Sequence, residues 1–168
     1  MSLEKDIKQK EFHSFYHKAI LNILYTQNYL VTIMADVFKD YDITRQQYNV
    51  LRILRGQYPG HASINLIKDR MIDKMSDTSR IVERLRLKGL IAREDGKSDK
   101  RSVEVTITHN GLDLLEKMQD RVDQFEDALN NLSLDEVIEL NRLLDKIRSK
   151  EPAEVEDVIQ SEELLKSS

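Results

Sequence analysis

The sequence predicts a mainly α-helical fold with one small β-ribbon and about six helices. Apolar residues recur at three- and four-residue intervals over most of the first 150 positions, which is helical spacing. Between residues 90 and 107 the spacing changes, and Val103, Val105 and Ile107 alternate with polar residues as in a half-buried strand. A helix that leads directly into a two-stranded ribbon with a polar, basic tip is the layout of a winged helix.

Composition places the chain among globular proteins. Its residues are 40% hydrophobic and 33% charged, and its length of 168 residues suffices for one domain, alone or with a helical appendage. The absence of cysteine excludes disulfides, thiolate catalysis and a thiol-oxidation switch. No apolar run reaches the ~18 residues of a membrane span, and the charged N-terminus is not a secretion signal. We therefore expect a cytoplasmic protein with no membrane partner.

Charge is distributed unevenly along the chain. The formal net charge is −4, yet residues 68–101 carry eleven Lys and Arg against seven Asp and Glu, a balance of +4. The remainder carries 15 basic and 23 acidic residues, a balance of −8. Because local charge steers a protein towards phosphate, this distribution indicates nucleic-acid binding more directly than the total does.

The first long element is a predicted helix over residues 7–38. Its apolar residues keep helical spacing, and no Pro or Gly interrupts it. A helix longer than about 25 residues is unusual in a small domain and suggests packing against a second chain. The alternative is a long core helix with no partner.

Three helices should then precede the ribbon. Thr44 and Gln47 have the spacing of a capping box at the start of the first, which ends at the Gly and Pro of residues 56–60. Ser63 is placed to cap a short helix over residues 64–71. The third helix, Met75–Lys88, ends at Gly89. Together with the short helix over residues 64–71 it forms a helix-turn-helix.

Two further helices should follow the ribbon. Thr108 can cap a helix that extends to about Asn130, and Ser133 and Glu136 form a second capping box for a helix ending near Lys150. The last helix is expected to bury four apolar residues, Val137, Leu140, Leu144 and Ile147. Residues 151–168 hold six Asp and Glu against one Lys, and we expect an acidic flexible tail.

The Met75–Lys88 helix has two chemically different sides. At 100° per residue, one side collects Thr78, Ile81, Val82 and Leu85. The other side carries small polar and charged residues: Ser76, Ser79, Arg80, Glu83 and Arg84. Such a face suits the major groove of DNA, although a plain solvated face has the same composition.

Two motifs carry a resemblance to a known family. Asp99-Lys100-Arg101 is followed by a strand and then by Thr108 and Gly111, and Arg-Leu-x-x-Lys-Gly-Leu-Ile occupies residues 84–91. In these features the chain resembles the MarR family of bacterial winged-helix transcriptional regulators, over residues 10–148. The resemblance implies a homodimer that binds a pseudo-palindromic operator, and small molecules that regulate its release.

The resulting domain prediction has three parts. Residues 1–40 and 109–150 form a helical dimerisation region, residues 41–108 a winged helix-turn-helix, and residues 151–168 the tail. The function predicted is a sequence-specific transcriptional regulator of the repressor type that binds double-stranded DNA. The alternative is a winged helix that serves as a protein-interaction module without DNA binding; it would not need the basic segment.

The predicted DNA contacts lie on the Met75–Lys88 helix, which would be the recognition helix, and on the wing. Arg101 is expected to enter the minor groove, whose narrow shape concentrates negative potential, while Asp99 holds the turn. Lys97 and Lys100 are candidates for phosphate contacts, or else solvated charges. The recognition-helix candidates are Ser76, Thr78, Ser79, Arg80 and Arg84.

Neither catalysis nor a cofactor is predicted. His13 and His17 have the i, i+4 spacing of a helical metal pair, but no glutamate between them completes a known motif, so no metal site is expected. There is no phosphate loop, dinucleotide fingerprint or nucleophile elbow. A small apolar or aromatic effector could bind between the dimer helices and the winged helix, with His13, Tyr16 and His17 as polar groups, although aromatics at this spacing also suit a core.

Overall fold

The computed structural model describes residues 2–95 and 103–149. The predicted wing-tip residues Lys97, Asp99, Lys100 and Arg101 lie outside these ranges, as does the predicted tail. Contacts divide the chain into two compact units, Met1–Ala128 and the segment from Leu129 onward. Because the first unit contains both the long helix and the winged helix, the division by predicted role into dimerisation and DNA-binding regions stays a prediction.

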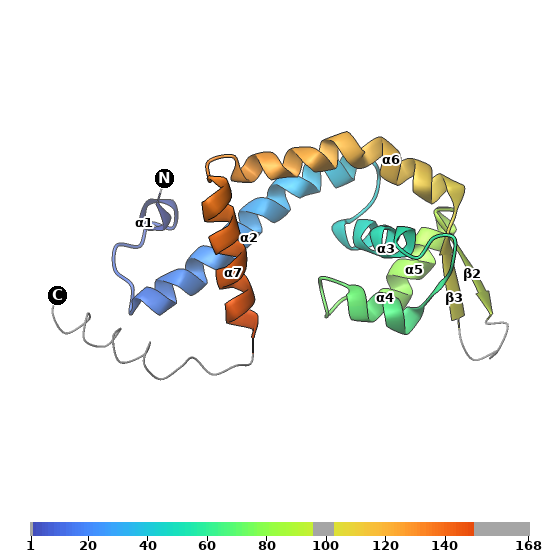
Figure 1. Ribbon diagram of the computed structural model, residues 1–168, viewed down its shortest axis with the longest axis horizontal. Coiled ribbons are helices and arrows are strands. Elements are labelled where there is room, and N and C mark those ends of the chain that lie inside the picture. The colour runs from blue at the N-terminus through green and yellow to red at the C-terminus, as the bar shows by residue number, and fades with distance from the viewer. Residues whose placement is uncertain (1, 96–102, 150–168) are drawn as a thin grey trace. The chain divides into compact units, whose positions relative to one another are not determined.

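The mainly helical fold with a small sheet is confirmed (Figure 1). In chain order the elements are α1 (Leu3–Asp6), α2 (Phe15–Asp40), α3 (Arg45–Arg55), β1 (Ala62–Ser63), α4 (Ile64–Arg70), α5 (Thr78–Leu87), β2 (Ile91–Asp95), β3 (Val103–Ile107), α6 (His109–Asp123), the 3-10 helix η1 (Gln124–Leu129) and α7 (Leu134–Arg148). In the first unit, α3, α4, α5 and the strands form the winged helix-turn-helix.

The predicted helix caps are confirmed. The Thr44 hydroxyl accepts the Gln47 N–H at 3.2 Å, and the Gln47 side chain accepts the Thr44 N–H at 2.9 Å. Ser63 and Thr108 accept N–H groups in the first turns of α4 and α6. Ser133 caps α7 in the same reciprocal way as Thr44 caps α3. Each cap satisfies backbone donors that have no partner inside the helix.

The prediction of a helix over residues 7–38 is wrong at its start. A short helix, α1, precedes a break at Lys8, whose φ is +55°, and α2 begins only at Phe15. Ser14 sets this start because its hydroxyl accepts the His17 N–H at 3.1 Å. His13 therefore lies before the helix, and the helical pair proposed for His13 and His17 does not form.

Two other predicted helices have different ends. The recognition helix α5 begins at Thr78 rather than Met75, because the Asp77 carboxylate caps the Arg80 N–H at 3.1 Å. The helix predicted to reach about Asn130 is α-helical only to Asp123 and then tightens into η1. Caps and changes of helix type set both ends.

The sheet has one strand more than predicted. β3 lies between β1 and β2 in an antiparallel sheet, with Ala62 opposite Val105 and Arg93 also opposite Val105 on the other side. β1 is two residues long and so has no alternating pattern to recognise. It ties the segment that leads into α4 to the base of the ribbon.

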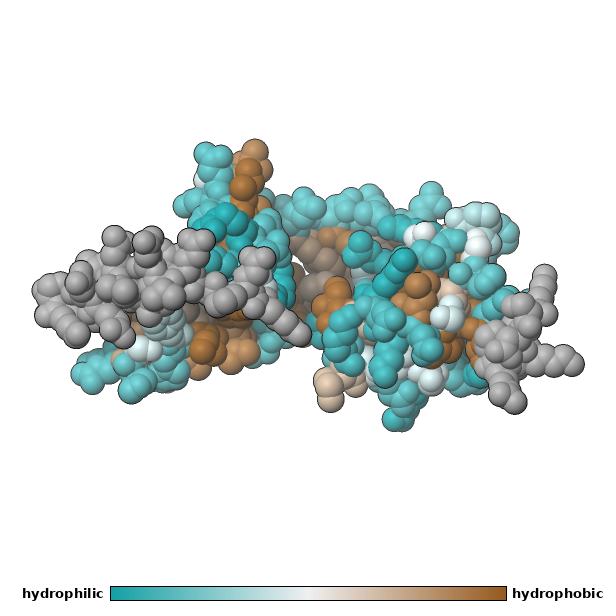
Figure 2. Space-filling view, turned by 60° about the horizontal axis from the view of Figure 1, so that its bottom comes forward, coloured by the Kyte–Doolittle hydropathy of each residue, from teal (hydrophilic) through white to brown (hydrophobic). Residues whose placement is uncertain are grey.

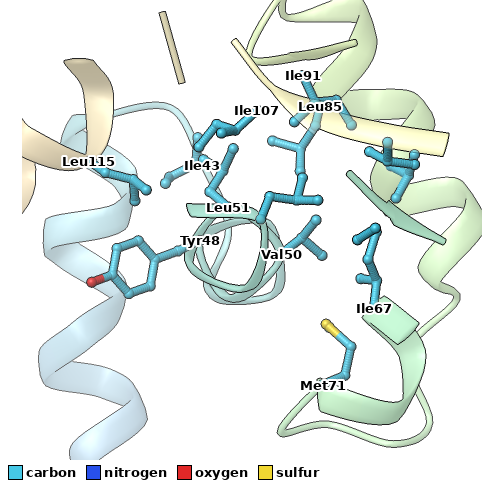
Figure 3. Close-up of a cluster of buried hydrophobic side chains, with 14 of the residues drawn as sticks. Ile43, Tyr48, Val50, Leu51, Ile67, Met71, Leu85, Ile91, Ile107 and Leu115 are labelled. Atoms are coloured by element: carbon cyan, nitrogen blue, oxygen red, sulfur yellow. The ribbon is translucent and has the colours of Figure 1, made fainter. Parts of the chain in front are cut away.

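The core of the first unit surrounds α3 (Figure 3). Val50 and Leu51 of α3 are fully buried, together with Ile67 of α4, Leu85 of α5 and other side chains from the sheet and α6. Burial also raises the pKa of the Tyr48 phenol, since the charged form loses its hydration. The core therefore joins every element of the winged helix to α3.

The expected burial along α7 does not occur within the chain. Leu140 is 36% exposed and Ile147 is 65% exposed, while Val137 and Leu144 are half-buried. No residue of α7 is buried.

Within residues 2–95 and 103–149, no helix combines the length and the apolar content needed to span a bilayer.

Gly111 provides a test of how α6 joins the ribbon. A Cβ at this position would lie 2.7 Å from Ile107 Cγ1 and even closer to the Leu90 carbonyl oxygen. We expect Gly111→Ala to lower the free energy of unfolding by about 1–3 kcal/mol, because the backbone must shift. Urea unfolding measures the change.

Gly56→Ala is the matched control. Gly56 has an ordinary φ of −68°, and an added Cβ would meet only normal contacts of 3.5 Å or more. Its stability should change by less than about 0.5 kcal/mol. Equal effects of the two substitutions would contradict the close approach at Gly111.

Candidate nucleic-acid interface

One side of helix α5 is buried against the core, and the opposite side is exposed. Val82 and Leu85 are fully buried, and the helix packs against α3, α4 and β2. Gly89 adopts a left-handed φ of +69° and ends the helix, as predicted. The opposite side faces solvent, which is the arrangement that a groove-binding helix requires.

Three of the predicted contact residues lie on this exposed side. Ser79, Arg80 and Arg84 are all exposed on α5. Among the described residues, neither Arg80 nor Arg84 forms an ion pair. Guanidinium groups that are not already paired can bind a guanine edge or a phosphate in a bidentate manner.

A further arginine on α5 is already paired. Arg86 donates to both carboxylate oxygens of Glu83, at 2.8 and 2.9 Å. The pairing lowers the pKa of the Glu83 carboxyl and raises the pKa of the Arg86 guanidinium. The negative charge of Glu83, which would otherwise repel phosphate, is therefore balanced on the helix itself.

The start of α5 is occupied by the protein's own carboxylates. Asp77 caps the helix, and the Ser76 hydroxyl donates to Asp73 Oδ2 at 2.9 Å in the preceding turn. This hydroxyl, and next the Met75 N–H, lower the pKa of Asp73. Ser76 is thus engaged in the turn, and its hydroxyl is not free as the sequence suggested.

Thr78 does not lie on the exposed face. Its side chain is 4% exposed, and its Oγ1 has no hydrogen-bond partner among the described residues. The cause is rotational position, since Thr78 precedes Val82 by four residues and shares its buried side. The assignment of Thr78 as a DNA contact is corrected accordingly.

A hollow of about 290 Å³ lies beside the two free arginines. Thr44 and Gln46, at the start of α3, form one side of it, and Arg80 and Arg84 form the other. The start of α3 therefore borders the same surface as α5. Sequence spacing alone does not reveal this neighbourhood, because the two segments are more than thirty residues apart.

The base of the wing is an ordered antiparallel ladder. β2 and β3 pair from Ile91 opposite Ile107 to Asp95 opposite Val103. Arg93 is exposed on β2 and adds a positive charge that was not among the predicted contacts. The roles of Lys97, Asp99, Lys100 and Arg101 concern residues outside the described ranges and stay predictions.

An apolar pocket of the first unit lies away from the predicted effector residues. This open pocket of about 740 Å³ lies between the second half of α2, the start of α3 and the end of α5, with Val31 and Phe38 among its apolar walls. His13, Tyr16 and His17 do not line it. His17 lies about 20 Å from Val31 along α2, at 1.5 Å per residue.

The predicted effector residues have separate environments. His17 packs edge-on against Phe12, with ring centroids 6.2 Å apart, and its Nδ1 is buried without a hydrogen-bond partner among the described residues. Tyr16 is 66% exposed on α2. Within the described residues no cluster of three or more metal-ligating side chains occurs.

A helix-turn-helix whose second helix is exposed on one side, followed by an antiparallel β-ribbon, defines a winged helix-turn-helix protein. Residues 43–103 match the MarR family. A relative from Pseudomonas putida, an HTH-type transcriptional repressor named IacR, is 32% identical over 83% of this chain and 80% of its own. The chain belongs to the MarR family of transcriptional regulators.

Solved structures agree with the assignment. A mutant of MarR from E. coli, complexed with operator DNA, is 27% identical with a TM-score of 0.67, over 74% of this chain and 89% of that one. BpsR from Bordetella bronchiseptica is 25% identical with a TM-score of 0.73, over 84% of this chain and all of that one. The DNA binding of BpsR is regulated by 6-hydroxynicotinic acid.

The predicted class of function is therefore confirmed. The chain is a DNA-binding transcriptional regulator with a winged helix. Proteins of this family are regulators and not enzymes, which also confirms the prediction that the chain is not an enzyme.

The exposed arginines generate a direct test. We expect Arg84→Ala to weaken binding to duplexes selected by the wild-type chain about 5- to 100-fold, since one bidentate base contact contributes about 1–3 kcal/mol. Fluorescence anisotropy measures the affinity. Arg142→Ala, on α7, removes an exposed arginine paired with Glu139 and should leave affinity within about twofold. Equal affinities of Arg84→Ala and wild type would contradict the contact.

Proposed function

We propose that this chain is a homodimeric repressor that binds a pseudo-palindromic operator and is released by a small apolar or aromatic effector. The observation that carries the proposal is the combination of two exposed surfaces. One is the charged face of α5, and the other is a set of apolar side chains on α2 and α7 that the single chain leaves uncovered.

The apolar side chains support a dimer. Only the last turns of α2 reach the core, through Val37 and Phe38. Over residues 15–29 it exposes seven large hydrophobic residues: Phe15, Tyr16, Ile20, Ile23, Leu24, Tyr25 and Tyr29. α7 exposes Leu134, Ile138, Leu140, Leu143 and Ile147. Hydrophobic surface is also open to solvent in Figure 2. Exposed apolar surface on this scale marks an interface between proteins, and a second copy offers the same surface in return.

A dimer would present two recognition helices to one duplex. Each α5 would enter a major groove, with half-sites one helical turn apart, about 34–36 Å. The paired Glu83 and the unpaired Arg80 and Arg84 give the inserted face a net positive charge. Repression would follow from occlusion of a promoter, in keeping with the named role of the P. putida relative.

The cavity between α2 and α5 supports regulation by a small molecule. Its volume of about 740 Å³ and mainly apolar walls suit an aromatic ligand, and Arg84 and Lys88 contribute positive charge. This location differs from the one expected from the sequence, which placed His13, Tyr16 and His17 around the ligand. An effector that binds here better in one arrangement of α5 than another shifts the protein towards that arrangement. The action of 6-hydroxynicotinic acid on BpsR provides a parallel.

The alternative, a protein-interaction module, is distinguished by salt. A chain that makes about six phosphate contacts should lose about a thousandfold in duplex affinity between about 50 and 200 mM salt, because binding releases counterions. Isothermal titration at several salt concentrations measures the slope. Absent binding, or affinity independent of salt, would favour the module.

The dimer is tested on the exposed face of α2. Ile20 is 57% exposed, and Ile20→Glu would place a charge in the proposed interface. We expect the wild-type mass in solution to be twice the 19.7 kDa of one chain, and the variant to approach a single chain at micromolar concentration. Analytical ultracentrifugation measures both.

Ile72→Glu is the matched control for the dimer. Ile72 is 75% exposed in the turn before α5 and lies on neither α2 nor α7. Its variant should keep the wild-type mass. A wild-type chain that sediments as a monomer, or an Ile20→Glu variant that remains a dimer, would contradict the proposed interface.

A further inference from the structure

One polar connection links the end of α2 to the end of the recognition helix. Lys88 Nζ donates to Asp42 Oδ2 at 2.9 Å and also to the Asp42 main-chain carbonyl oxygen. The two residues are 46 positions apart in sequence. Lys88 is the C-cap residue of α5, and Asp42 follows the last turn of α2.

Both ends of this connection are held rigidly on their own helices. The Asp42 N–H donates to Lys39 O and the Ile43 N–H to Phe38 O, each at 3.0 Å, and Asp42 takes a left-handed φ of +51°. This pattern is a Schellman closure of α2. The Asp42 main chain, including its carbonyl oxygen, therefore has a defined position relative to α2.

The end of α5 is closed in the same way. The Gly89 N–H donates to Arg86 O at 2.9 Å, and the Leu90 N–H donates to Leu85 O at 3.1 Å. Lys88 thus extends from a fixed point at the end of the recognition helix. A bond between two such points relates the direction of one helix to that of the other.

Little else relates these two helices directly. α5 packs on α3, α4 and β2, and the space between α5 and α2 is the 740 Å³ cavity. Asp42 and Lys88 both line that cavity. Packed side chains would resist rotation of α5 on this side, whereas a cavity does not.

The pair is too exposed to serve mainly as a stabilising contact. The Asp42 side chain is 97% exposed, and that of Lys88 is 32% exposed. Ion pairs at such positions add little to the stability of a fold, because water screens the charges. A bond that joins two fixed helix ends can instead constrain the orientation of one helix relative to the other.

We propose that Lys88, through Asp42, is a positioning residue that sets the angle of the recognition helix relative to α2, and thereby the half-site spacing that the dimer accepts. The inference rests on the proposed homodimer, in which α2 belongs to the interface. A change in the angle of α5 alters the separation of the two recognition helices without altering any residue that contacts DNA.

The test uses full-length chains and duplexes selected by the wild type from a random pool. From the preferred duplex, spacers longer and shorter by one and two base pairs are made. Affinities are measured for wild type, Lys88→Gln, Asp42→Asn and the conservative Lys88→Arg. Lys39→Gln is the control, because Lys39 lines the same cavity and has no ion-pair partner among the described residues.

The expected result is a loss of spacing discrimination. In Lys88→Gln, affinity for the preferred spacing falls about three- to tenfold, whereas affinity for altered spacings changes less than about twofold. Asp42→Asn should show the same trend, while Lys88→Arg restores discrimination and Lys39→Gln retains it. Thermal midpoints should stay close to wild type, which separates orientation from folding.

Other outcomes overturn the proposal. A phosphate-contact role for Lys88 predicts a uniform loss at all spacings and no loss in Asp42→Asn. Unchanged discrimination in Lys88→Gln would refute the positioning role while leaving the proposed dimer intact. A wild-type chain that binds duplexes without any spacing preference would overturn the dimeric mode of binding and this inference with it.

Discussion

The burial of α3 is the constraint on which the rest of the first unit depends. Val50 and Leu51 are fully buried, and α3 packs against α2, α4, α5, α6 and β3. Its apolar residues face these neighbours, whereas Arg52 and Arg55 are exposed, and its start is fixed by the reciprocal cap of Thr44 and Gln47. The recognition helix inherits its position from this core through Leu85, so its outer face can carry residues chosen for contact with DNA.

Charge explains how an acidic chain presents a basic surface. The positive balance of residues 68–101 falls in the part of the sequence that contains α5 and β2, whereas the remainder of the chain is acidic. Three carboxylates within this segment have hydrogen-bond or ion-pair partners in the chain. Asp77 caps α5, Asp73 holds the preceding turn, and Glu83 pairs with Arg86. These three acids are bonded within the chain, and Arg80 and Arg84 remain as unpaired charges on the exposed face of α5 among the described residues.

The features that could be predicted from the sequence are those with local causes. Caps at Thr44, Ser63, Thr108 and Ser133 depend on residues three positions apart, and all four occur. The strand β1 could not be predicted, because two residues carry no period and pair only through contact with β3. Helical rotation correctly placed Arg80 and Arg84 on the exposed side of α5, and their contact with DNA stays a prediction. Thr78 was included against its own rotation, which places it beside Val82.

In the proposed function, the pocket beside α5 would connect DNA recognition with regulation by a ligand. Arg84 lines both this cavity and the hollow at the front of α5, so a ligand that attracted its guanidinium would compete with DNA for the same charge. Lys88 lines the cavity as well and holds the end of the same helix to Asp42. An anionic aromatic molecule would therefore meet both cations at once. Such a ligand would lower operator affinity in two ways. It would bind Arg84, a proposed DNA contact, and it would weaken the bond between Lys88 and Asp42 that is proposed to orient the helix.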